Sequence, residues 1–505
     1  MGSEFSRREF LAISGLLGCA LPLASCSNLN GYIADRFGGG IPEKVGVTNG
    51  QEIDPAFHLI SRAGFGPWPG DVENIKKQGV NNWIEEQLQP EKIDDRLCDF
   101  RTKRFESVFL DPATCYEFKR EALRKDLCRY HLMRSVYSKR QLLESMVEFF
   151  SDHFNIYIEK GDCIYLKATD DRSVIRKNAL GRFRDLVLAS ATSPAMLVYL
   201  DGKENKKDGP NGIPNENYAR ELLELHTLGV DGGYTQKDVY EAARCLTGWR
   251  LGSESKRGTA FFDPGFHDDG QKVVLGKKIP AGGGQKDVEM LVDIACNHPS
   301  TARHIAKKLV AHFVCEEAPP ALVKRVAKRF SDTGGQIKPM LREILYSNEF
   351  RASAGSKLKR PFQYVVSCMR ATGADTMAGD EVLEFLTRMG HGPFQYPTPD
   401  GYPAEANPWL GTLLWRWNFA FALCSNSIET ANVSLDSLCA AIGLEDLESI
   451  KKDPERLFAY LSGRRATAQE SKAFRAYVSR RDFKDEKVRD ELIGLILSSP
   501  AFQKV

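Results

Sequence analysis

Apolar residues recur at three- and four-residue spacing in nearly every segment of this chain from Asp54 onward, which is the period of one buried helix face. Asp54-Pro55 supplies a helix cap and a first-turn proline, and the apolar-periodic run 56–63 follows. Strand patterns are confined to 259–262 and 272–275, which flank a Gly-containing loop and predict a small hairpin. We therefore expect an all-α protein, with a large multi-helix domain that carries a small β-hairpin insertion.

The composition is that of a globular chain, since 42% of the 505 residues are hydrophobic and 27% are charged. A formal net charge of +2 gives no support for binding to nucleic acid, and we expect no such partner. The helical pattern divides into a main domain at 51–355, with an insertion at 251–285, and a C-terminal helical region at 356–505.

The N-terminus has the parts of an export signal. Arg7 and Arg8 precede a short apolar run that ends at Ala24, which is the order of charged start, apolar middle and small-residue end in a signal peptide. Adjacent arginines at this place are typical of the twin-arginine signal, which exports proteins already folded. We expect residues 1–25 to be removed, and an ordinary secretory signal is the alternative.

The signal ends in Leu23-Ala24-Ser25-Cys26, which has the form of a lipobox. Cys26 is then the acylated first residue of a lipoprotein, anchored to the inner or the outer membrane on the periplasmic side. A cysteine present there by chance is the alternative. Residues 26–50 contain three consecutive glycines and little periodicity, as expected of a flexible tether.

Twelve cysteines are present, and ten remain when Cys19 in the signal and Cys26 at its end are set aside. None forms a Cys-x-x-Cys pair, which argues against a zinc-finger type of site. Several stand among apolar residues, where buried thiols are expected, with disulfides as the alternative in an oxidising compartment. The sequence also lacks a Gly-rich phosphate loop, a Gly-x-Ser-x-Gly elbow and a His-Glu-x-x-His motif.

Two histidines are expected to point into helix–helix contacts. At 100° per residue, His153 lies within the apolar face of a helix at 139–157, and His226 lies within that of a helix at 216–228. Two buried imidazoles on two helices are suitable ligands for a transition metal or a haem. The alternative is a pair of core histidines satisfied by hydrogen bonds.

The opposite side of the second helix carries Asn217, Glu221 and Glu224, with Arg220 nearby. On a regular helix, His226 cannot share a metal with these carboxylates. Glu221 and Glu224 are candidate acid–base groups if this side is buried, and part of a solvated stripe if it is exposed.

Four further residues are candidates for a site. His267 and Asp268 stand in a Gly-rich loop, where they supply either a ligand pair or general base, or only turn chemistry. His58 and Arg62 are four residues apart and therefore neighbours on one helical face.

Two other features bear on a binding site. His304 and Lys308 share one helical face, which we interpret as surface and packing. The stretch 390–403 is rich in proline, glycine and aromatic residues and has no periodicity. Long ordered loops of this kind often rim a binding site.

Several motifs together resemble one protein family. They are 57–67 (FHLISRAGFGP), 146–154 (MVEFFSDHF), 214–230 (PNENYARELLELHTLGV), 233–235 (GYT), 246–249 (LTGW), 267–268 (HD) and 499–503 (SPAFQ). With them the chain resembles the bacterial "domain of unknown function 1800" family over roughly residues 54–503. The resemblance implies an exported, mainly helical protein, often encoded beside a partner of the "domain of unknown function 1501" family. It implies no catalytic mechanism.

Two functions are compatible with these patterns. The first is a metal- or haem-dependent envelope enzyme, oxidative rather than hydrolytic. Its ligands and acid–base groups are His153, His226, Glu221, Glu224 and His267. The second is a non-catalytic lipoprotein that scaffolds or delivers a partner, which predicts an exposed apolar patch.

Overall fold

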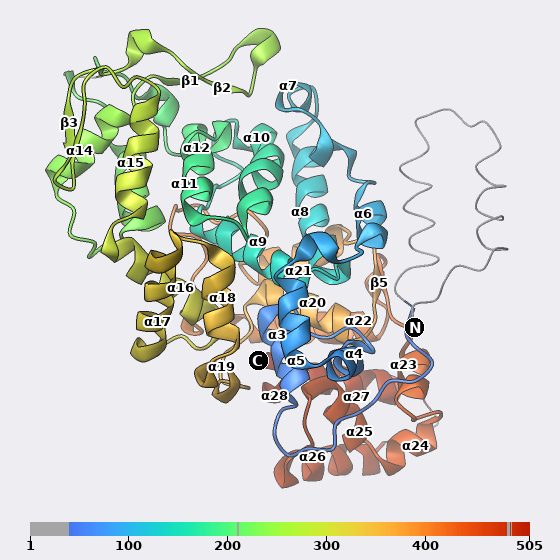
Figure 1. Cartoon of the computed structure of the whole chain (residues 1–505). Coiled ribbons are helices and arrows are strands. Elements are labelled where there is room, and N and C mark those ends of the chain that lie inside the picture. The colour runs from blue at the N-terminus through green and yellow to red at the C-terminus, as the bar shows by residue number, and fades with distance from the viewer. Residues whose placement is uncertain (1–39, 210–211, 482–484, 486) are drawn as a thin grey trace.

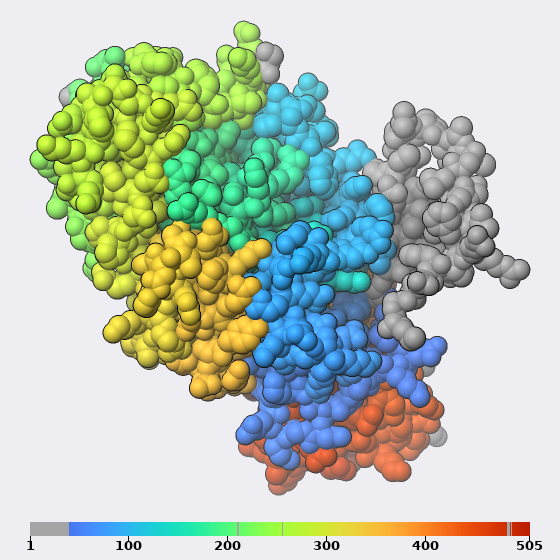
Figure 2. All heavy atoms as spheres, viewed as in Figure 1, coloured from blue at the N-terminus to red at the C-terminus, as the bar shows by residue number. Residues whose placement is uncertain are grey.

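The computed structural model describes residues 40–209, 212–481, 485 and 487–505, which are coloured in Figure 1 and Figure 2. The export signal with Arg7 and Arg8, and the lipobox with Cys26, lie outside the described residues. In the described part of the chain, no helix combines the length and the apolar character needed to cross a membrane.

The fold is mainly helical, as predicted (Figure 1). The helices up to residue 200 are α3 (Pro55–Ala63), α4 (Asp71–Gln78), α5 (Val80–Gln87), α6 (Arg96–Thr102), α7 (Pro112–Cys115), α8 (Arg120–Tyr137), α9 (Gln141–His153), α10 (Cys163–Asp170), α11 (Phe183–Ala191) and α12 (Pro194–Tyr199). The next are α13 (Asn217–Glu221), α14 (Gln236–Cys245), α15 (Lys286–Cys296), α16 (Pro299–Phe313), α17 (Pro320–Thr333), α18 (Ile337–Leu345) and α19 (Asn348–Ala352). The C-terminal region holds α20 (Pro361–Ala371), α21 (Asp380–Arg388), α22 (Leu413–Cys424), α23 (Leu435–Ala441), α24 (Leu447–Lys452), α25 (Glu455–Ser462), α26 (Ala468–Ser479), α27 (Lys487–Ser498) and α28 (Pro500–Gln503).

The first helix begins where the sequence predicts. Asp54 accepts hydrogen bonds from the main-chain N–H groups of Ala56 and Phe57, and Pro55 is the first residue of α3. The cap satisfies donors that have no partner inside the helix.

Two apolar cores hold the helices together. The first core joins α3, α5 and α9 to the helices from α11 to α18. The second joins α8 to α20, α22, α25 and α27, so α8 packs against the C-terminal region. Helix α9 lies between them, because its apolar residues belong to the first core while Glu148 bonds to His131 of α8.

The β-structure differs from the expected hairpin in its pairing. Strand β2 (Ala260–Phe262) pairs with β1 (Trp249–Leu251), and β3 (Lys272–Val274) pairs with β4 (Lys277–Ile279). Both predicted strands exist, but they do not pair with each other. Strand β2 pairs with the strand before it, and β3 pairs with the strand that follows it after a tight turn, because these partners are nearer in the chain. A further short pair, β5 (Asp375–Thr376) with β6 (Ala431–Asn432), lies in the C-terminal region.

Two helices contain π-helical turns, η4 (Asp171–Arg176) and η7 (Leu222–Thr227). In η7 the N–H of Leu228 donates to the carbonyl of Leu223 at 2.9 Å, five residues back. A π turn rotates less per residue than a regular helix. The assumption of 100° per residue is therefore wrong for 222–227, although His226 is buried as that assumption predicted.

The ten cysteines of the described residues are free thiols, and nine of them are buried. Burial of these thiols agrees with their apolar sequence neighbours.

Candidate active-site cleft

A cleft with a volume of about 420 Å³ lies between α9, α16 and the loop 396–405. Helix α9 contributes Asp152 and His153 to its wall, and α16 contributes His304 and Lys308. This volume is in the range of small-molecule binding sites.

Lys308 and His153 are hydrogen-bonded to each other on the cleft wall. Nζ of Lys308 lies 2.9 Å from Nδ1 of His153, and Nε2 of His153 lies 3.1 Å from the main-chain oxygen of His226. Because a carbonyl can only accept, Nε2 carries the imidazole proton and Nδ1 presents its lone pair to the amine. His153 is thus held in one tautomer with both nitrogens engaged.

The environment makes Lys308 an unusual lysine. Burial lowers the pKa of Lys308 to about 8, against the charges of Asp152 and Asp400, which raise it. Burial also drives the pKa of His153 well below its ordinary value, and the charge of Lys308 adds to this. A lysine that loses its proton near neutral pH is a candidate nucleophile or base. Because the pKa of His153 is lowered so far, its imidazole does not accept the proton of Lys308, and we infer that it positions the amine.

His226 and His304 flank His153. Both ring centroids lie 6.2 Å from the His153 centroid. Burial lowers the pKa of His226 to about 3 and that of His304 to about 4, so both rings are neutral at pH 7. Nε2 of His304 lies 3.3 Å from the carbonyl of Leu225, whereas neither nitrogen of the buried His226 has a partner within the described residues. The histidines predicted to meet at a helix–helix contact therefore lie side by side.

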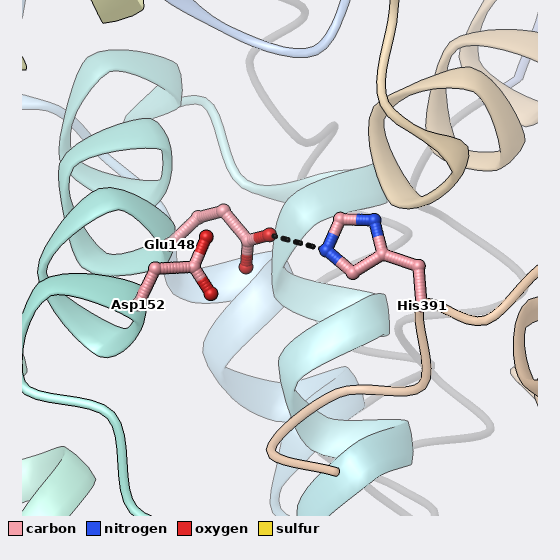
Figure 3. A group of neighbouring side chains, drawn as sticks. All are labelled: Glu148, Asp152 and His391. Atoms are coloured by element: carbon pink, nitrogen blue, oxygen red, sulfur yellow. Dashed lines mark ion pairs between the residues drawn. The ribbon is translucent and has the colours of Figure 1, made fainter. Parts of the chain in front are cut away.

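A carboxylate pair lies one turn apart on α9, at Glu148 and Asp152 (Figure 3). Arg360 forms ion pairs with both, and Nε2 of His131 lies 2.8 Å from the Glu148 carboxylate. Burial alone would raise the pKa of Glu148, but the bond and charge of His131 and the charge of Arg360 hold it at about 2. Burial raises the pKa of Asp152 to about 6, against Arg360. Two carboxylates in one site whose pKa values differ are suited to different proton-transfer roles.

Figure 3 shows Glu148 and Asp152 pointing from α9 toward His391. In the described part of the chain, these three are the group whose ligand atoms lie close enough together to hold a metal ion. The N–H of Phe362 donates to Nδ1 of His391 at 3.2 Å, so the proton is on Nε2, which faces Glu148 at 3.7 Å. With no lone pair facing the carboxylates, and Arg360 bonded to both, the group is a buried ion network rather than a metal site.

The long loop predicted to rim a binding site lies along the cleft. Asn155 donates to the main-chain oxygens of Tyr396 and Thr398, which fixes the loop to the end of α9. Gly401 has φ +76°, and a Cβ atom there would lie 2.3 Å from the main-chain oxygen of Asp152. Glycine is therefore required for the loop to approach α9 so closely.

Four residues of the predicted carboxylate side do not line this cleft. They are Asn217, Arg220, Glu221 and Glu224. The Tyr234 hydroxyl donates to the Glu224 carboxylate at 2.9 Å. Burial and then the charge of Glu224 raise the pKa of Glu221. Asn217 is exposed and the other three residues are half-buried, and the polar groups of this side bond locally.

His267 and Asp268 are placed in the β insertion and do not line the cleft. Nε2 of His267 lies 3.2 Å from the buried Asp287, which also pairs with Lys272 at 2.5 Å. Asp268 forms a two-point ion pair with Arg244 at 2.7 and 3.0 Å. Their contacts join the insertion to α14 and α15.

His58 and Arg62 join α3 to a distant part of the chain. Nε2 of His58 lies 2.8 Å from the carbonyl of Phe350. Nη2 of Arg62 donates to the main-chain oxygens of Ser353 and Val505 at 3.1 and 2.7 Å.

The interpretation of His304 and Lys308 as surface and packing is corrected, because their shared face lines the cleft. Their four-residue spacing was the signal. Asp152 and Arg360 carried no local signal, since their pairing joins distant segments.

Fold and cleft together define a mainly helical protein with a cleft of a size that suits a small molecule. The sequence matches the model of the family described as "Protein of unknown function (DUF1800)" over residues 58–504, and the chain belongs to that family. No curated protein and no solved structure matches the chain.

Proposed function

We propose that this protein is an exported, lipid-anchored enzyme of the cell envelope that acts on carbonyl compounds through the amine of Lys308. One observation carries the proposal: a cleft-lining lysine with a lowered pKa is held by a histidine that is itself held by the main chain. A nucleophile, a partner within hydrogen-bond reach and a third group that orients the partner are the usual elements of a covalent catalyst.

The reaction balances without an oxidant or a reductant. The unprotonated amine of Lys308 attacks the carbonyl carbon, and a C–N bond forms as the carbonyl π bond breaks. The oxygen takes a proton, for which Asp152 is the candidate donor because its pKa is about 6. Asp152 regains that proton from the nitrogen and donates it again to the hydroxyl, which leaves as water. The water thus carries in total the two protons that the amine has lost; Asp152 takes the second of them from the nitrogen and is restored, and an imine joins Lys308 to the substrate.

The test is reductive trapping on the full chain. Butanal with sodium cyanoborohydride at pH 7 converts an imine into a stable secondary amine, which peptide mapping by mass spectrometry locates. Lys308 should be modified before Lys307, an exposed neighbour on α16 that also lines the cleft but is not bonded to His153, and Lys308→Met should remove that fast phase. Lys307→Met is the matched control. Equal rates at the two lysines would refute the amine chemistry.

Export and anchoring are supported by the sequence alone. Labelled palmitate should enter the wild-type protein and not Cys26→Ser, and Arg7→Lys with Arg8→Lys should retain the precursor in the cytoplasm. Palmitate in the Cys26→Ser variant would contradict the lipobox.

A second candidate function is a transition-metal or haem site at the histidine cluster. The supporting observation is His226, a buried neutral imidazole whose two nitrogens lack partners among the described residues. An unpaired buried donor or acceptor costs about 1–3 kcal/mol, which a bound metal would offset. Elemental analysis and the visible spectrum of protein purified from the cell envelope test this candidate function. Absence of both stoichiometric metal and a chromophore would exclude the metal or haem site.

The alternative to an enzyme is a non-catalytic lipoprotein that scaffolds or delivers a partner, such as a protein of the 1501 family. The supporting observation is an exposed apolar stripe at Leu410, Leu414 and Trp417, one turn apart along α22 and the turn before it. Such stripes mark interaction surfaces. Co-purification that is lost in a Leu414→Ser, Trp417→Ser variant would support this alternative, and recovery of a lone monomer under gentle conditions would oppose it.

A further inference from the structure

A second, smaller cavity of about 30 Å³ adjoins the cleft. Three residues line both hollows: His312, Lys357 and Arg360. The smaller cavity is also lined by Arg62 of α3 and by Ser145 and Glu148 of α9. A water molecule needs about 10–15 Å³ measured in this way, so the cavity has room for a group larger than one water.

Two arginines line this cavity, Arg62 and Arg360, with one carboxylate, Glu148. Burial, and then the charges of the two arginines, drive the pKa of Lys357 well below its ordinary value, so Lys357 adds a hydrogen-bond donor rather than a charge. Arg360 forms ion pairs with Glu148 and with Asp152. Arg62 is therefore the lining cation without a carboxylate side-chain partner among the described residues.

Arg62 carries donors that nothing in the described chain satisfies. Its Nη2 donates to main-chain oxygens of Ser353 and Val505, but Nε and Nη1 are buried without a partner. The side chain is almost wholly buried, with 2% of its residue surface exposed. A guanidinium group can only donate, so its missing partner is an acceptor, and a carboxylate matches a guanidinium edge with two parallel bonds.

The other polar groups that line the cavity do not supply the missing acceptor for Arg62. Nζ of Lys357 donates to the carbonyls of Ala311 and His312 at 2.8 and 2.9 Å, at the end of α16. Nε2 of His312 lies 3.2 Å from the hydroxyl of Ser145. Burial, and then nearby positive charge that includes Arg360 and Arg62, drives the pKa of His312 well below its ordinary value, so it adds no further charge. An anion placed here meets the guanidinium groups of Arg62 and Arg360.

We propose that this cavity binds the acid group of the substrate, so that the cleft takes a small oxo acid with its carbonyl at Lys308 and its carboxylate at Arg62. The proposal rests on the amine chemistry proposed above for the assignment of the carbonyl end. The anion site itself rests only on the cavity and on the unpaired donors of Arg62.

The first experiment compares two aldehydes in reductive trapping on the full chain. 4-Oxobutanoate carries a carboxylate and butanal, of the same chain length, does not; the rate at Lys308 is divided by the rate at exposed Lys307 in the same sample, which cancels intrinsic reactivity. We expect a preference for 4-oxobutanoate of about tenfold or more, the usual scale of a charge-assisted hydrogen bond. Arg62→Gln should abolish the preference and leave the butanal ratio unchanged. Equal ratios for the two aldehydes in the wild-type protein would overturn the oxo-acid assignment while leaving the amine chemistry in place.

The second experiment tests the anion site without reference to Lys308 and without a variant that could fail to fold. Crystals of the wild-type protein are soaked in sodium bromide, and the anomalous signal of bromide is mapped. A peak in the cavity within hydrogen-bond distance of Nε or Nη1 of Arg62 supports the site. A cavity without a bromide peak, in crystals that show bromide elsewhere, would overturn it. If Lys308 traps neither aldehyde faster than Lys307, the amine chemistry fails, and the bromide map alone then decides the anion site.

Discussion

The amine of Lys308 and Nδ1 of His153 are 2.9 Å apart, and the proton in that bond belongs to the lysine. The ring cannot turn to offer an N–H to the amine, because its Nε2–H is bonded to the main-chain oxygen of His226. His153 therefore acts as a positioning residue, and burial sets the pKa of the amine. Position and pKa can be tested separately.

The rate of trapping at Lys308 should rise with pH to a midpoint near 8, rather than near the ordinary lysine value of 10.5. Asp400 stabilises the ammonium form, so Asp400→Asn should move the midpoint lower still. Glu405 also lines the cleft, and Glu405→Gln serves as the control with an unchanged midpoint. The measurement is the initial rate of modification against pH. A wild-type midpoint above 10, or an upward shift in Asp400→Asn, would contradict the electrostatic argument.

A buried carboxylate should matter more to stability than an exposed one. Glu144 of α9 is fully buried between Arg134 and Arg176, at 2.9 and 2.7 Å. Removing it leaves Arg176 with only a longer ion pair to Asp171 at 3.5 Å. Arg134 keeps its ion pairs with Asp95 and Asp99. Glu144→Ala should therefore cost about 3 kcal/mol of unfolding free energy, the lower end of the range for a broken buried ion pair. Glu85→Ala breaks the exposed pair with Arg342 and should cost no more than about 1 kcal/mol. Chemical denaturation measures both, and similar losses would show that burial does not set the difference.

The same pair also predicts an acid dependence. Burial alone would raise the pKa of Glu144, but Arg176 and Arg134 hold it at about 2, below its ordinary value of 4.5. A lowered pKa means that the ionised form stabilises the fold. The contribution is fully present above pH 4.5 and is lost as the pH falls toward 2. The difference in stability between wild type and Glu144→Ala should therefore shrink over that range.

His267 should behave as a structural residue. Its bond to the buried Asp287, which also holds Lys272, ties the insertion to α15. His267→Phe should lower the unfolding free energy by about 1–3 kcal/mol, because the buried main-chain oxygen of Thr247, 2.9 Å from Nδ1 of His267, loses its donor. The same variant should leave the trapping rate at Lys308 unchanged, since His267 does not line the cleft. A folded variant with lost trapping would restore His267 to the catalytic site.

The sequence was sufficient for those features that depend on local chemistry. Asp54 and Pro55 fixed the start of α3, and apolar periodicity placed His153 and His226 inside the protein. It also identified the proline-rich loop beside the cleft. Each of these depends on residues only a few positions apart.

Other features depended on contacts between distant segments. The meeting of Lys308 with His153 joins residues far apart in the chain, as does that of Arg360 with Asp152. The spacing of residues within one helix or strand does not predict such pairs. The π turn at 222–227 was also hidden, because it changes the rotation per residue without an obvious change in the apolar pattern.

Lys308 and a metal ion should compete for the histidine cluster. The amine occupies the lone pair of Nδ1 on His153, which a metal ligand must leave free. Lys308 also places a positive charge beside His226, whose pKa is lowered first by burial and then by that charge. Lys308→Met removes both obstacles and should bind Co²⁺ at least about tenfold more tightly than the wild type, while His226→Gln should bind it more weakly than either.

Titration at pH 7 with the visible bands of Co²⁺ measures these affinities, and Lys307→Met controls for loss of a nearby positive charge without loss of the bond. The competition separates the two candidate functions of the cluster. If Lys308→Met binds Co²⁺ no better than Lys307→Met, the imidazoles are not arranged to receive a metal, and the histidines serve to hold the amine. If only Lys308→Met gains affinity, the ammonium group of Lys308 occupies the position that a metal ion would take. A bound metal would then account for the unpaired nitrogens of His226.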